Sequence, residues 1–158
     1  ANTIGVSAML ATLLMSGREL LAGLLRLFYG VANRYVGSLS MLIVSVILGS
    51  ITLSFMPLAK TYPELILISI ALGISGAFVP PALNLLVGAS AKPEDQAFAI
   101  LCLGIGHFFV QTLTAPVVGS MIFNFGYSTS YPVIGLFWTV AAVIMFTFGK
   151  RVLVEDSK

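Results

Sequence analysis

Four polar side chains lie inside long apolar stretches of this sequence: Arg18 and Glu19 near its start, and His107 and Gln111 in its second half. Arginine binds carboxylates, whereas glutamate and histidine accept and release protons. A charged side chain is costly inside a bilayer, so such residues usually face a protein interior or a water-filled path. The set predicts contact with a charged solute or transfer of a proton. The alternative, left open here, is that these side chains only pair with neighbouring helices.

The composition indicates an integral membrane protein. Of the 158 residues, 58% are hydrophobic and only 9% are charged, with a mean hydropathy of +1.05. A soluble domain carries roughly 25% charged residues, and this chain has too few to cover a water-facing surface. With one histidine, one cysteine and six acidic residues, we expect no metal site, no cofactor and no enzyme. The net charge of +2 gives no indication of nucleic-acid binding.

Length and hydropathy predict an all-α, polytopic helix bundle with about five transmembrane spans, because about 20 apolar residues cross the roughly 30 Å core of a bilayer. Short polar turns separate the candidate spans, and a charged cytoplasmic tail follows the last of them. The predicted spans cover residues 3–29, 36–58, 64–90, 96–125 and 131–149, and the tail covers residues 150–158.

The basic residues near the predicted turns favour one side of the membrane. Lys60 alone lies at the second turn, and the fourth turn has none. The others lie at the first turn, the third turn or the tail, and they are Arg26, Arg34, Lys92, Lys150, Arg151 and Lys158. The positive-inside rule places these segments in the cytoplasm and the N-terminus outside. We expect the protein to lie in the plasma membrane.

Helical periodicity places Arg18 and Glu19 on different faces of the first span. Small and polar residues recur there at steps of three and four, and Glu19 lies on this face with Ser16 and Gly23. Such a face lets helices approach closely or lines a cavity. Arg18 lies about 100° around the helix, on a leucine-rich face. We therefore expect the two charges to have separate partners.

The fourth span places His107, Gln111 and Thr114 on one face near its middle. This face suits a proton relay or a contact with an anion. A simple hydrogen bond between His107 and Gln111 is the alternative.

Prolines predict kinks in two spans. Pro80 and Pro81 in the third span and Pro116 in the fourth each remove a backbone hydrogen bond. A kinked helix beside a cavity is common in transporters, but kinks also occur in other bundles.

Two motifs resemble the major facilitator superfamily. In GVANRYVG, Asn33 stands where that family's loop signature has an acidic residue, and Arg34 matches its arginine. We expect the first turn around residues 31–34, with Gly30 and Gly37 permitting it. The segment TAPVVGSM is similar to the family's proline–x–x–glycine helix. The resemblance implies the second to sixth helices of one six-helix half, and residues 114–138 favour helices 8–12 of the carboxy-terminal half.

Two branches of the superfamily share further features with the chain. PLAKTYPE and residues 114–138 resemble the monocarboxylate porters, in which an arginine of the eighth helix binds the substrate carboxylate. The resemblance implies this role for Arg18. The chain departs from the pattern of that branch in two ways: Gly23 follows Arg18 by five residues instead of four, and Leu14 stands one turn before Arg18 where the branch has an aspartate. KPEDQAFAI and TAPVVG resemble the organic-anion transporting polypeptides, which we rank second.

The resemblance implies a secondary transporter, or part of one, that moves a small organic solute by rocking of two halves. The expected solute is a monocarboxylate or another organic anion, with proton coupling. Five spans do not enclose a pathway, so the remaining half or another chain must complete it. The alternative is a non-transporting membrane scaffold or accessory subunit with the same fold. The predicted pathway residues are Arg18, Glu19, His107 and Gln111, and the predicted gate and turn residues are Gly30, Asn33, Arg34 and Gly37.

Overall fold

A computed structural model describes residues 8–155. The apolar runs fold as helices because a bilayer offers no hydrogen-bond partners to an open backbone. Within the described range there is no β-strand. The elements are α1 (Ala8–Arg26), α2 (Tyr29–Val36), α3 (Ser38–Phe55), the short 3-10 helix η1 (Met56–Leu58), α4 (Tyr62–Ser90), α5 (Gln96–Phe125) and α6 (Tyr127–Glu155).

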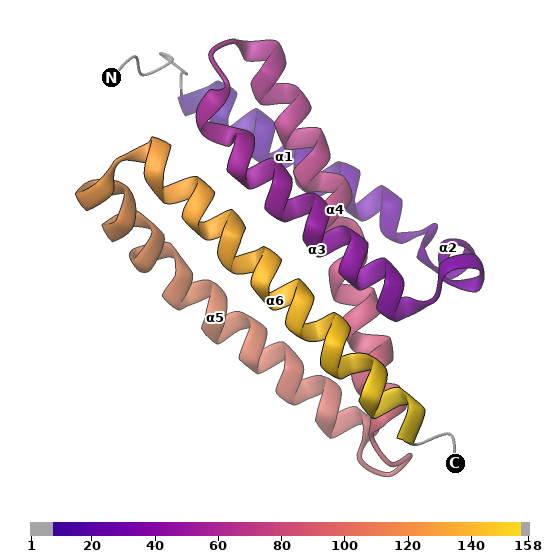
Figure 1. Cartoon of the computed structure of the whole chain (residues 1–158). Coiled ribbons are helices and arrows are strands. Elements are labelled where there is room, and N and C mark those ends of the chain that lie inside the picture. Colours follow the sequence, from indigo (N-terminus) through magenta and orange to yellow (C-terminus); the bar gives the residue numbers. More distant parts are fainter. Residues whose placement is uncertain (1–7, 156–158) are drawn as a thin grey trace.

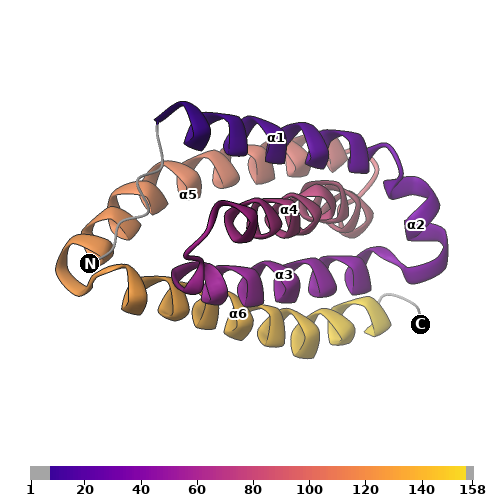
Figure 2. The same ribbon diagram turned by 90° about the horizontal axis from the view of Figure 1, so that it is seen from above.

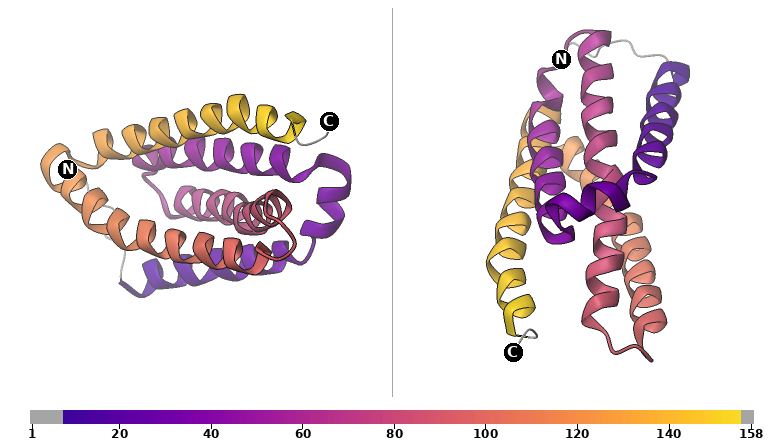
Figure 3. Two further views of the ribbon diagram at one scale, coloured as in Figure 1. Left: turned by 90° about the horizontal axis from the view of Figure 1, so that it is seen from below. Right: turned by 90° about the vertical axis from the view of Figure 1, so that its right-hand side faces the viewer.

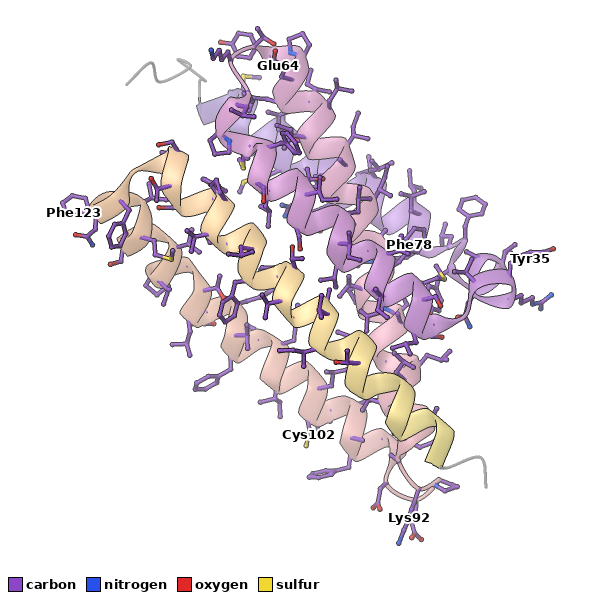
Figure 4. The ribbon with its side chains drawn as sticks, viewed as in Figure 1. Tyr35, Glu64, Phe78, Lys92, Cys102 and Phe123 are labelled. Atoms are coloured by element: carbon purple, nitrogen blue, oxygen red, sulfur yellow. The ribbon has the colours of Figure 1, made fainter. Side chains whose placement is uncertain are left out.

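The long helices run alternately in opposite directions (Figure 1). As a result, Tyr35 of α2 and Lys92 of the α4–α5 turn lie toward one side of the bundle, and Glu64 and Phe123 lie toward the other (Figure 4). Four of the described helices are long and apolar enough to cross a membrane: Ser38–Leu58, Tyr62–Ser90, Gln96–Phe125 and Tyr127–Ile144. The predicted fold class, an all-α polytopic membrane bundle, is confirmed.

Four helices pack side by side in the order α1, α4, α3, α6 (Figure 2). A buried apolar cluster joins α2, α3, α4 and α6, and its members are Tyr29, Met41, Leu42, Val46, Ala82 and Ala142. The side-by-side order brings α3 between α4 and α6, which explains why α3 holds more of the described buried residues than any other helix.

Small residues let α3 and α4 approach closely. A methyl group at Gly49 would lie 2.5 Å from Oγ of Ser75 on α4. The hydroxyl of Ser75 donates a hydrogen bond of 2.7 Å to the carbonyl of Ser45. Lipid tails are as apolar as the helix surfaces, so the hydrophobic effect does not drive helices together inside a membrane. Their association depends on such close packing and on hydrogen bonds between helices.

The α3–α6 interface has the same character. A methyl group at Gly135 of α6 would lie 2.7 Å from the carbonyl oxygen of Ser50 and would also contact the hydroxyl of Ser54. The hydroxyl of Ser54 donates to that same carbonyl at 2.9 Å. Only glycine fits between these groups.

Helix α5 is packed much less than the others. It connects α4 to the start of α6 (Figure 3), and none of its residues is buried. Its partly buried residues lie near its two ends, at Ala99 and Leu103 and at Val118, Met121 and Ile122, whereas residues 104–117 are all exposed. The middle of α5 is therefore open within the described chain.

The first turn differs from the prediction. Residues 31–34 lie inside α2, so the expected turn there is wrong. The chain reverses instead at 27–28 and at Gly37, whose φ of 80° and ψ of 147° suit glycine alone. Gly30 lies in the helix.

Two further boundaries differ from the sequence-based expectation. A single residue, Gly126, with φ 76°, separates α5 from α6, so residues 127–130 are helical. Helix α6 also continues through the start of the charged tail to Glu155. Helix α4 runs without a break through Pro80 and Pro81, as α5 does through Pro116, and a bend at these prolines stays a prediction.

Candidate functional site

Arg18 and Glu19 form an ion pair on the surface of α1. Nη2 of Arg18 lies 2.6 Å from Oε1 of Glu19, and Nε donates to the same oxygen at 3.2 Å. The prediction of separate partners is therefore wrong. Both side chains are long enough to bridge the angle between adjacent helical positions. The side chains are 38% and 60% exposed, so the pair is accessible.

Arg18 also lies in the contact between α1 and α4. A methyl group placed at Gly73 of α4 would lie 3.2 Å from the backbone carbonyl oxygen of Arg18, its nearest neighbour. Beside this contact, α1 and α4 form an open groove of about 250 Å³. The groove is lined by apolar side chains and glycine, with Arg18 and Ser69 as the polar exceptions. Two polar residues therefore lie in an otherwise apolar wall.

The small and polar face of α1 is not the face that packs on α4. Ser16, Glu19, Gly23 and Arg26 are all exposed, and a methyl group at Gly23 would meet no atom within 4 Å. Among the α1 positions whose burial the structure describes, the partly or fully buried ones are on the other side, and they are Leu14, Arg18, Leu21, Ala22 and Leu25. Within the described chain, no helix covers the face that carries Glu19.

His107 and Gln111 contact each other on α5. Nε2 of the histidine lies 2.9 Å from Nε2 of the glutamine, a contact in which the amide N–H donates to an unprotonated ring nitrogen. The hydroxyl of Thr114, one turn further along, donates to the carbonyl of Val110 at 2.7 Å. The structure thus contains the local hydrogen bond that the sequence offered as an alternative. Both side chains remain exposed, so a role in a pathway stays a prediction.

The structure does not join the two polar pairs. Helix α1 packs on α4, whereas α5 packs on α4 and α6. Among residues 8–155, no hydrogen bond or ion pair links Arg18 or Glu19 to His107 or Gln111. In the same range, no three His, Cys, Asp or Glu side chains come together as metal ligands.

A hydrogen-bonded chain that was not predicted from the sequence holds α2 against α3. The buried Tyr29 hydroxyl donates to Oγ of Ser38 at 3.0 Å, and Ser38 donates to Oδ1 of Asn33 at 2.7 Å. Asn33 stands at the acidic position of the family's loop signature, and it acts here as the acceptor. The signal was present as Tyr29 and Asn33 four residues apart, followed by a serine after Gly37.

Comparison with known proteins assigns the chain to a family. The sequence pattern of the Major Facilitator Superfamily matches residues 1–157. No curated protein and no solved structure gives a significant match. The predicted resemblance to the superfamily is thereby confirmed, whereas neither of the two predicted branches is supported. Proteins of this family are membrane transporters and not enzymes, and the helical bundle described above has the architecture of part of such a domain. The chain belongs to the major facilitator superfamily.

Proposed function

We propose that this chain is part of a secondary transporter that moves a small organic anion, with a monocarboxylate as the leading candidate, together with protons. One observation carries the proposal: a charge pair, Arg18 with Glu19, lies exposed in the middle of α1, the helix for which the sequence predicts the first membrane span. Glu19 lies about 16 Å from the start of α1 and about 10 Å from its end. Charges at such depth are retained for function more often than for packing.

The pair provides a simple way to couple an anion to a proton. Arg18 uses two of its five N–H groups on Glu19, and it can exchange this partner for the carboxylate of a solute. An unpaired carboxylate is costly inside a membrane, so Glu19 then takes up a proton. Binding of the anion and uptake of the proton therefore favour each other.

The open faces of α1 and α5 support a pathway between this bundle and a second one. Glu19 on α1 and His107 and Gln111 on α5 lie on faces that no described helix covers, while α4 and α6 each pack on α3. In this superfamily the solute site lies between two halves that rock against each other. We place the described helices in the carboxy-terminal half, with the remaining half, or another chain, on the open side. In this arrangement the C-terminus is cytoplasmic and the protein lies in the plasma membrane.

The experiment measures uptake of a radiolabelled monocarboxylate into liposomes that contain the complete transporter. An inward proton gradient should accelerate uptake by the unmodified protein. Glu19→Gln should lose this acceleration while still catalysing exchange of solute for solute. Glu94→Gln, an exposed carboxylate in the α4–α5 turn, is the matched control and should behave as the unmodified protein.

Two results would count against the proposal. An unchanged response of Glu19→Gln to the gradient would refute the coupling role of Glu19. Absence of both uptake and exchange in the unmodified protein, tested over a series of organic anions, would favour the non-transporting scaffold.

A further inference from the structure

We propose that α2, with the end of α1, forms a binding surface for the headgroup of an anionic phospholipid. The surface consists of Arg26, Arg34 and Tyr35 together with Val31. In this assignment Arg34 binds the lipid phosphate, Arg26 at the end of α1 adds positive charge, and the tyrosine anchors α2 in the membrane interface.

The position of α2 along the bundle is the first argument. Helix α3 and η1 together form a candidate span of 21 residues, Ser38–Leu58. Its length is about 30 Å, which equals the hydrocarbon thickness of a bilayer. Helix α2 ends at Val36, with only Gly37 between it and Ser38, and lies across the axes of the long helices (Figure 3). It therefore lies at the level of the lipid headgroups.

The fixed orientation of α2 is the second argument. Tyr29 is buried and, through Ser38, is linked to Asn33, so one face of α2 is held against α3. The positive φ of Gly37 sets the angle between the two helices. The opposite face of α2 is therefore directed away from α3.

The residues on that opposite face fit a membrane interface. Val31 and Tyr35 are one turn apart and are 60% and 86% exposed. Arg34 lies beside them, about 100° around the helix. Figure 4 shows Tyr35 directed away from the bundle. Tyrosine is enriched where membrane meets water, and basic residues beside it attract anionic lipid.

The charges on this surface lack protein partners. Among the described side chains, the ion pair that forms is between Arg18 and Glu19. Neither Arg26 nor Arg34 lies within 4 Å of a described carboxylate. The described carboxylates near the same side, Glu94 and Asp95, lie in the α4–α5 turn and make no ion pair with either arginine. A lipid phosphate is the anion that a bilayer supplies at this depth. Arginine binds it through two parallel N–H groups.

The test is native mass spectrometry of the complete protein in detergent, titrated with phosphatidylglycerol or phosphatidylcholine. The protein should retain phosphatidylglycerol preferentially. Arg34→Gln should weaken this binding about five-fold, the fold-change expected for one basic residue at an anionic surface, and adding Arg26→Gln should weaken it further. Arg34→Lys should keep most of the preference. Lys92→Gln, an exposed basic residue toward the same side but outside α2, is the matched control and should have no effect.

Other outcomes would overturn the proposal. Equal retention of the two lipids by the unmodified protein would refute it, as would equal losses for Arg34→Gln and Lys92→Gln. Competition by inorganic phosphate at the same concentration as the lipid would show a general anion site and would also refute it. Should Arg34 serve only to brace a gate, its replacement would change transport equally in both lipids and leave lipid retention unchanged, which would refute the lipid role.

Discussion

Replacing Gly135 of α6 with alanine tests the close approach of α6 to α3. The added methyl group would lie 2.7 Å from the carbonyl oxygen of Ser50 and would also overlap the hydroxyl of Ser54. The hydroxyl can rotate away, but it would then lose its hydrogen bond of 2.9 Å to that carbonyl. The carbonyl belongs to the backbone of α3 and cannot rotate. The two helices must therefore separate.

The expected loss of stability follows from two opposing effects. Forcing a methyl group into a packed interface costs about 1–3 kcal/mol. Alanine favours a helix over glycine by about 1 kcal/mol, which offsets part of this loss. Because the closest neighbour is backbone, we expect the upper part of the range and a net loss of about 2 kcal/mol. For a chain of this size, that corresponds to a fall in Tm of about 4–8 °C.

Thermal unfolding followed by circular dichroism in detergent measures this change. Gly119→Ala on α5 is the matched control, because a methyl group there would meet no atom within 4 Å. It should leave Tm unchanged or raise it slightly. Combining Gly135→Ala with Ser54→Ala should restore only part of the loss, since the contact with Ser50 remains. Equal Tm values for the Gly135 and Gly119 variants would refute the close α3–α6 contact.

Three further substitutions test separate contacts. Ser75→Ala removes the hydrogen bond of 2.7 Å to the carbonyl of Ser45 and should lower the unfolding free energy by about 1 kcal/mol. The hydroxyl of Ser90 bonds within its own helix, so Ser90→Ala is the control and should not lower it; equal Tm values for the two variants would contradict the interhelical role of Ser75. Gly37→Ala forces alanine to adopt a φ of 80° and should lower the unfolding free energy by about 1–3 kcal/mol, so an unchanged Tm would argue against this turn geometry. Glu64→Ala removes the acceptor for the backbone N–H groups of Lys60 and Thr61, and hydrogen exchange should become faster at these two residues and in the first turn of α4 and nowhere else.

Local features of the candidate site were predictable. The contact between His107 and Gln111 joins residues four apart on one helix, and such pairs face each other whatever the helix packs against. The same locality explains why the bounds of α5, 96–125, agree with the predicted fourth span. By contrast, the buried Tyr29–Ser38–Asn33 chain depends on where α2 turns into α3 at Gly37, whereas the turn predicted from the sequence lies several residues earlier, at 31–34.

Sequence alone determined that this is a bundle of membrane helices, because helix formation in a bilayer needs only a long apolar run with its own backbone hydrogen bonds. It did not determine which face of each helix packs. In α1 the small and polar face was expected to contact a neighbour or line a cavity, yet the face containing Leu14 and Arg18 packs on α4. A soluble helix buries its apolar face, so its sequence marks the contact. In lipid every apolar face is equally well solvated, and the fit between distant residues such as Gly135 and Ser50 decides the packing. Only the tertiary structure contains that fit.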